Sequence, residues 1–130
     1  MSKNKIYVAV VDDDDSFARA IGRLLRASGF EISTYPSAEA FLATTPLPSV
    51  DCLVLDIQLG GMSGVELQQR LHELGDLTPI IFVTAHDAPE VRAEAVQAGC
   101  AAYLRKPVAS RALMEAVAKA LRPGDQTISS

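Results

Sequence analysis

The chain has 130 residues, 48% of them apolar, with 12 lysine and arginine residues against 16 acidic ones. This size suits one domain with a continuous core, and the net charge of −4, without a basic cluster, argues against nucleic-acid binding by this segment. No apolar run reaches membrane-spanning length, and the chain begins without the h-region and cleavage site of a signal peptide. We therefore expect a cytoplasmic domain that contacts no membrane.

The first half of the chain alternates apolar runs with helical patterns. Residues 6–11 form a continuous apolar run, typical of a strand buried on both faces, which stops at four consecutive aspartates, residues 12–15. Residues 16–29 then place apolar side chains at the spacing of an amphipathic helix and end in a glycine. The alternating run 30–35 predicts a strand near the edge of a sheet, and a short helix is expected over 36–42.

The second half repeats this alternation three times. Strands are predicted over residues 52–55, 80–83 and 101–104, and helices over 64–75, 87–99 and 113–121. Asp87 and Pro89 form the expected opening of the second of these helices. Asp56, Thr84 and Lys106 stand at or just beyond the ends of the three strands.

Strands that alternate with helices predict a parallel sheet with helices packed on both faces. The most apolar strands, residues 6–11, 52–55 and 80–83, are expected in the centre and the other two at the edges, which gives the order 2-1-3-4-5. This is the order of the flavodoxin-like fold, a three-layer (βα)5 sandwich of the α/β class. We expect one domain over residues 1–122, with 123–130 as a polar tail or the start of a linker.

Ligands bind such a sheet beyond the carboxyl ends of its strands, where the strand order reverses. The predicted strands present Asp12, Asp13, Asp56, Thr84 and Lys106 at that edge. Two carboxylates about 4 Å apart repel each other by about 4 kcal/mol at an effective dielectric constant of 20. A cluster of three therefore needs a proton or a cation, and hard oxygen ligands that leave room for water favour Mg²⁺.

A carboxylate beside Mg²⁺ predicts phosphoryl transfer, which depends on positioning and charge neutralisation more than on covalent machinery. Asp56 would be the nucleophile and form an acyl phosphate, while Thr84 and Lys106 stabilise the phosphoryl oxygens. Taken singly, each residue also has an ordinary structural explanation. Asp56 could be a turn former or a cap, Thr84 a cap, and Lys106 a solvated surface charge.

Four motifs together resemble the response-regulator receiver domain of two-component signalling. They are Val10-Val11-Asp12-Asp13-Asp14, the run from Leu55 to Gly64, Val83-Thr84-Ala85, and Lys106-Pro107. The resemblance extends from Ile6 to about Leu121. Around residues 35–39 and 84–87 the sequence is most similar to receivers of nitrogen-fixation and LuxR-type transcription regulators, which implies either a stand-alone receiver or the front of a longer regulator.

The resemblance implies roles for individual residues. Asp56 would accept a phosphoryl group from a sensor histidine kinase, and Lys106 would bind that group. Mg²⁺ would be bound directly by Asp13, by Asp56 and by the backbone carbonyl of Gln58. Asp12 would bind the ion through water.

The resemblance also implies a switch. Thr84 and Tyr103 would reorient on phosphorylation and change the face formed by the fourth helix, the fifth strand and the last helix, which would dimerise or dock a partner. Such a domain is a signalling phosphoacceptor rather than an enzyme, although it phosphorylates itself from phosphodonors and dephosphorylates itself. A cis peptide bond is expected between Lys106 and Pro107.

One departure from the family pattern lies in the loop after Asp56. Gly60 stands where a proline is usual, and glycine leaves the backbone more conformations to restrict. We therefore expect a less rigid loop, without loss of any chemical group from the site.

Two other functions remain open for a chain with this topology. A flavodoxin-like FMN carrier would need a hydroxyl- and glycine-rich phosphate loop after the first strand, where this chain has four acids. A Mg²⁺-dependent aspartyl-phosphate phosphatase would need an acid two residues after its nucleophile, where this chain has Gln58.

Overall fold

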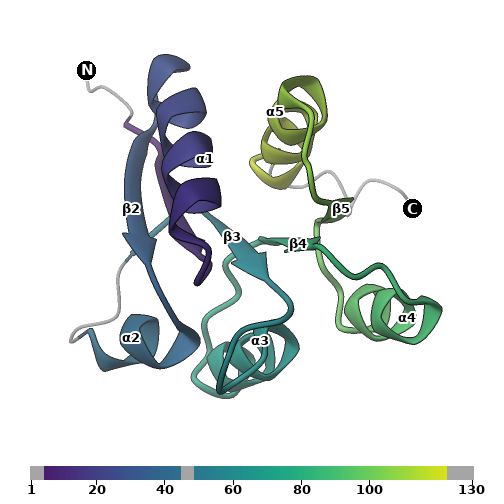
Figure 1. The fold of residues 1–130 in the computed structure, drawn as a ribbon. Helices are drawn as coiled ribbons and strands as arrows, with labels where there is room; N and C mark the ends of the chain where they lie inside the picture. The colour runs from purple at the N-terminus through teal and green to yellow at the C-terminus, as the bar shows by residue number, and fades with distance from the viewer. Residues whose placement is uncertain (1–4, 45–48, 123–130) are drawn as a thin grey trace.

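The computed structural model describes residues 5–44 and 49–122. Five strands alternate with five helices (Figure 1). The elements are β1 Tyr7–Val11, α1 Asp15–Ala27, β2 Glu31–Tyr35, α2 Ala38–Ala43, β3 Cys52–Asp56, α3 Gly64–Glu73, β4 Ile80–Thr84, α4 Pro89–Gln97, β5 Ala102–Arg105 and α5 Ser110–Ala120. The tail expected at 123–130 lies outside the described residues. Across the described parts of the chain, no helix has both the length and the apolar character that crossing a bilayer requires.

The strand order confirms the predicted flavodoxin-like α/β fold. All pairings are parallel, and the order is β2-β1-β3-β4-β5. Because β1 lies between β2 and β3, the order reverses there, and a crevice for ligands is expected beyond the carboxyl ends of β1 and β3. The register pairs Val11 with Leu55, so Asp12 and Asp56, each one residue further on, lie side by side at the carboxyl edge of the sheet.

The two faces of the sheet carry separate halves of the core. In β3, Cys52 and Val54 belong to the cluster packed under α1 and α5, whereas Leu53 and Leu55 belong to the cluster packed under α2, α3 and α4. Figure 1 shows the same division, with α1 and α5 on one side of the sheet and the other three helices on the opposite side. Alternate side chains of a strand point to opposite faces, so a strand covered on both faces is apolar throughout.

Burial separates the central strands from the edge strands. Every residue of β3 and β4 is buried, and only the first residue of β1 is exposed. β2 and β5 contain only half-buried and exposed residues, which confirms their predicted edge positions. Each fully buried large apolar side chain stabilises the fold by about 1.5–3 kcal/mol, so the three central strands hold the residues at their carboxyl ends firmly.

Side-chain caps fix the starts of two helices near this edge. The Asp14 carboxylate accepts a hydrogen bond from the Phe17 N–H (3.1 Å) at the start of α1. Ser63 and Glu66 form a reciprocal capping box at the start of α3. Such caps satisfy N–H groups that the helix itself leaves unpaired, and they fix where each loop ends.

α4 begins differently from the sequence-based expectation. Pro89 is its first residue and Ala88 precedes it without any side-chain cap. Asp87 does not cap the helix, because its carboxylate instead accepts a hydrogen bond from the Tyr103 hydroxyl (2.8 Å). A contact with a distant strand has replaced the local one.

Candidate functional site

Three carboxylates converge beyond the carboxyl ends of β1 and β3. Asp12, Asp13 and Asp56 each offer an oxygen, and these oxygens lie within 4.8 Å of one another. Asp12 and Asp56 are only 2% and 5% exposed, whereas Asp13 is exposed. The structure therefore brings together the acids that the strand pattern predicted to meet.

The backbone orients two of these carboxylates. One oxygen of Asp12 accepts a hydrogen bond from the Asp14 N–H (2.8 Å), and one oxygen of Asp56 accepts from the Gln58 N–H (3.0 Å). These are Asx-type turns, in which the side chain binds the backbone two residues further on. The second oxygen of each carboxylate is left for the cluster.

Lys106 bridges those second oxygens. Its ammonium nitrogen lies 2.9 Å from Asp12 Oδ2 and 3.4 Å from Asp56 Oδ2, and its side chain is 14% exposed. The Lys106 N–H donates to the Thr84 carbonyl (2.8 Å), which ties the residue to β4, and the expected cis peptide bond joins Lys106 to Pro107. A cation from the end of β5 is thus held against acids from β1 and β3.

One lysine does not neutralise the cluster. Burial raises the pKa of the Asp56 carboxyl to about 6, the charge of Asp12 adds to the rise, and the Gln58 N–H and Lys106 offset it only in part. Burial alone would lower the pKa of Lys106, but the hydrogen bond and charge of Asp12, together with Asp56, outweigh burial and raise it. The site therefore favours additional positive charge.

The donor set fits a hard divalent cation. All side-chain donors are carboxylate oxygens, which Mg²⁺ prefers. Asp12 Oδ2 is buried, and apart from the Lys106 ammonium at 2.9 Å it has no donor among the described residues. A pocket of about 220 Å³ opens against Asp12 and Asp13 on the side of Thr34 and Tyr35. Gln58 is exposed, and its N–H binds Asp56. The Gln58 carbonyl therefore belongs to the turn that directly follows the acidic cluster.

The hydroxyl groups of the two proposed switch residues form their hydrogen bonds with residues outside the carboxylate cluster. Thr84 is buried, and its hydroxyl accepts from the His86 N–H (3.0 Å) and donates to the His86 carbonyl (3.1 Å). Tyr103 donates its hydroxyl to Asp87 (2.8 Å), and the Arg92 guanidinium lies 4.6 Å from its ring centroid. Both hydroxyl groups are therefore engaged in the region that leads into α4.

Two further contacts, one within the site and one in the loop that follows β3, were missed by sequence reasoning. The Phe17 ring lies 4.3 Å from the Lys106 ammonium, and Glu39 of α2 accepts a hydrogen bond from the Met62 N–H (2.8 Å) in the loop after β3. The helical spacing explained Phe17 as a core residue, and Glu39 reads as an acid in the first turn of a helix. No local pattern indicates their partners, which lie far away in the sequence.

Comparisons with a family model, with related sequences and with solved structures all point to the same family. The response regulator receiver domain family matches residues 8–118. Response regulator protein TmoT of Ectopseudomonas mendocina is 32% identical over 126 residues, which are 97% of this chain and 57% of TmoT. Transcriptional regulatory protein FixJ of Rhizobium meliloti strain 1021 is 34% identical over 113 residues, 87% of this chain and 55% of FixJ. A crystal structure of a response regulator receiver protein from Burkholderia phymatum matches with a TM-score of 0.78 and 46% identity, covering 90% of this chain and 95% of that one.

The match to the family extends over the acidic cluster, Thr84, Tyr103 and Lys106. The chain spans little more than half the length of the relatives TmoT and FixJ. The resemblance found in the sequence is confirmed, and it displaces the flavin-carrier and phosphatase alternatives. The chain belongs to the response regulator receiver domain family of two-component systems.

Proposed function

We propose that Asp56 is the phosphoacceptor of this receiver domain and that a sensor histidine kinase is its donor. The observation that carries the proposal is the cluster of Asp12, Asp13 and Asp56, with carboxylate oxygens within 4.8 Å of one another and Lys106 bridging two of them. Asp56 is central because it lies at the end of the fully buried strand β3 and contacts the lysine. In this role the domain is a signalling phosphoacceptor rather than a conventional enzyme.

The reaction transfers a phosphoryl group from a histidine nitrogen of the kinase to a carboxylate oxygen of Asp56. A carboxylate oxygen of Asp56 attacks the phosphorus of a phosphohistidine, the P–N bond breaks, and the imidazole leaves with the bonding electrons. Asp56 then carries an acyl phosphate, and Lys106 is placed to pair with one of the phosphoryl oxygens. Later attack by water on phosphorus releases inorganic phosphate and restores the carboxylate, so the domain resets itself.

Asp12, Asp13, Asp56 and the Gln58 carbonyl would hold the Mg²⁺ of this site, with Asp12 acting through water. A bound Mg²⁺ would neutralise charge on the acids and on the transferring phosphoryl group. Asp13 supplies an exposed carboxylate at the mouth of the site, and Asp12 supplies the buried oxygen with acceptor capacity to spare.

Thr84 and Tyr103 would carry the signal toward α4, β5 and α5. To donate to a phosphoryl oxygen, the Thr84 hydroxyl has to give up its bond to the His86 carbonyl, which loosens the start of the β4–α4 loop. Tyr103 has to leave Asp87. Moving such an equilibrium from 1:99 to 99:1 needs about 5.5 kcal/mol of differential binding, which a few charge-assisted hydrogen bonds can supply.

The face formed by α4, β5 and α5 would then dimerise or dock a partner. Light scattering with and without beryllofluoride tests self-association through it. An unchanged molar mass would contradict dimerisation as the output. The relative FixJ, named a transcriptional regulatory protein, supports a place for this domain in a transcription regulator.

Intact-mass spectrometry with acetyl phosphate tests the phosphoacceptor directly. Wild-type protein with Mg²⁺ should gain the mass of one phosphoryl group, and the gain should disappear with EDTA. Asp56→Asn should show no gain, whereas Glu115→Gln, which changes an exposed acid of α5, should behave as wild type. Phosphorylation that persists in Asp56→Asn would place the acceptor elsewhere.

A further inference from the structure

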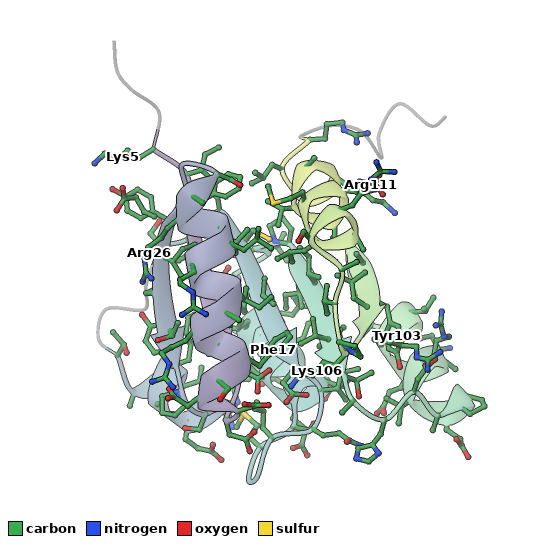
Figure 2. The ribbon with its side chains drawn as sticks, turned by 45° about the horizontal axis from the view of Figure 1, so that its top comes forward. Lys5, Phe17, Arg26, Tyr103, Lys106 and Arg111 are labelled. Atoms are coloured by element: carbon green, nitrogen blue, oxygen red, sulfur yellow. The ribbon has the colours of Figure 1, made fainter. Side chains whose placement is uncertain are left out.

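Lys106 has a third neighbour besides its two carboxylates. The centroid of the Phe17 ring lies 4.3 Å from its ammonium nitrogen. Figure 2 shows the two labelled residues side by side, Phe17 on α1 and Lys106 in the segment that follows β5. The contact therefore joins two elements that are far apart in the sequence and that flank the acidic cluster.

The distance and the burial favour a cation–π interaction. A cation within about 6 Å of an aromatic ring centroid is attracted to the ring face, and more strongly when water is excluded. The Lys106 side chain is 14% exposed, so its ammonium is largely shielded from water. A lysine ammonium has three donors, and Asp12, Asp56 and the Phe17 ring together supply three partners.

The position of the ring is itself well fixed. The Phe17 N–H is bound by the Asp14 cap (3.1 Å), and its side chain packs against the core cluster under α1 and α5. Phe17 therefore lies in the first turn of α1, directly after the segment that carries Asp12 and Asp13. The half-buried Phe17 ring is thus anchored on α1, and the Lys106 side chain lies against it.

We propose that Phe17 is a positioning residue for Lys106, holding the ammonium at the acidic cluster when its carboxylate partners are taken. This inference rests on the proposed function and deepens it. Once Asp56 carries a phosphoryl group and Asp12 serves a cation, both carboxylates stop being free partners of Lys106. The Phe17 ring takes part in neither event, so it remains against Lys106 and limits the rotamers from which the ammonium meets the phosphoryl oxygens.

A purely structural role for Phe17 makes a different prediction. If the ring only fills space in the core, then replacing it should lower stability and leave phosphorylation unchanged. Phe30 provides the matched control, because it packs against the same core cluster but precedes β2, at the opposite end of the sheet from the acids. Phe17→Tyr retains an aromatic face, whereas Phe17→Leu retains only apolar volume.

The first test reads the geometry without any phosphoryl donor. Protons above the face of an aromatic ring are shielded, so the Cε protons of Lys106 should resonate upfield in wild type, and in Phe17→Tyr, relative to Phe17→Leu and to an exposed lysine such as Lys119. Equal shifts in wild type and Phe17→Leu would overturn the inference whether or not Asp56 is ever phosphorylated.

The second test measures the rate constant for phosphorylation by acetyl phosphate with saturating Mg²⁺. Phe17→Leu should lower it by about threefold to tenfold, in keeping with a shielded cation–π contact. Phe17→Tyr should stay within about twofold of wild type, as should Phe30→Leu. In a Lys106→Met background, Phe17→Leu should have no further effect, because the cation that the ring holds is already gone.

The outcomes separate the two proposals. A wild-type protein that gains no phosphoryl group refutes the proposed function, and the ring-shift measurement still judges the Phe17 contact. If wild type is phosphorylated and Phe17→Leu matches Phe30→Leu in rate, the positioning role is wrong. An equal loss from Phe17→Leu with and without Lys106 would also refute it.

Discussion

Asp56 sits in surroundings that disfavour its own charge. Burial raises its pKa to about 6, with a further contribution from Asp12, and Lys106 at 3.4 Å offsets only part of this. A carboxyl that is more easily protonated in the folded state than in the unfolded chain destabilises the fold wherever it is ionised. The free domain thus carries strain at the residue that is proposed to do its chemistry.

Asp56→Asn should therefore stabilise the domain in EDTA at pH 7, by about 1–2 kcal/mol once solvent screening of the carboxylate is allowed for. The folded-state pKa is above the unfolded value, so wild-type stability falls as the pH rises from about 4 through about 6. The difference between wild type and Asp56→Asn should be smallest near pH 4 and largest above pH 6. Urea unfolding at a series of pH values measures it.

Glu115→Gln is the control for this comparison, because it removes one exposed acid away from the cluster. It should follow the wild-type curve at every pH. A variant Asp56→Asn that is equally stable at pH 7, or less stable, would mean that the carboxylate is not under charge stress in the folded protein.

At the scale of elements, the loop between β3 and α3 is held closely at both ends. Gly64 opens α3 and donates its N–H to the Ile57 carbonyl (2.9 Å). Glu39 of α2 binds the Met62 N–H in the middle, and this bond lowers the pKa of Glu39. The loop that lacks the usual proline at Gly60 is thus tied to a neighbouring helix instead.

Gly64→Ala should destabilise the domain by about 1–3 kcal/mol, the usual cost of overpacking. A Cβ at this position would overlap the Asp56 carbonyl and come within 2.9 Å of the Ile57 Cα, both of them backbone atoms. Gly60→Ala is the matched control, because its nearest neighbour would be an Asp13 oxygen at 4.0 Å. Thermal unfolding compares the two, and equal losses would contradict the proposed close approach.

Glu39→Ala should speed hydrogen exchange of the Met62 amide severalfold, since it removes the acceptor of that N–H. Gly61→Ala should do the same, because its Cβ would come within 2.5 Å of Glu39 Oε2 and push the carboxylate aside. The double variant should exchange its Met62 amide only slightly faster than either single variant, because both changes break the same hydrogen bond.

Glu39→Gln keeps an acceptor oxygen and serves as the conservative control, with a smaller effect expected. Fully additive changes in Met62 exchange would show that Glu39 and Gly61 act on the loop independently.

At the scale of the whole molecule, the central strands link the two halves of the core. β3 contributes alternate side chains to both clusters, so opening the sheet at this strand exposes both at once. The acids, the lysine and the switch residues all extend from this sheet. Its global stability therefore limits how well the site is organised.

The reactivity of the two free cysteines reports on how the sheet opens. Cys52 in β3 is fully buried, and burial raises the pKa of its thiol to about 12, whereas Cys100 is only half-buried. Cys52 should react with a thiol reagent only through global unfolding. Its labelling rate should therefore fall as the free energy of unfolding, measured with urea, rises from one variant to the next. Cys100 should react faster, through local opening.

Single-cysteine variants, Cys100→Ala and Cys52→Ala, isolate the two rates. Equal rates for both thiols, or a Cys52 rate that does not change between stabilised and destabilised variants, would show that β3 opens locally.

The sequence by itself determined the order of elements, the strand order and the meeting of Asp12, Asp13 and Asp56. Continuous apolar runs mark central strands because both faces are covered, and parallel strands bring their carboxyl ends to one edge. Those two rules act on local patterns, so a single sequence suffices for them. Lys106 was placed by the same reasoning.

Tertiary structure alone decided the contacts of Phe17 with Lys106, of Glu39 with Met62 and of Asp87 with Tyr103. It also decided the raised pKa of the Asp56 carboxyl. Each depends on the distance between side chains from separate elements and on how completely packing removes water from around them. The periodicity of a sequence gives neither the distance between side chains nor the extent of their burial. The same amphipathic helix can present an identical residue to the core, to a cation or to a loop.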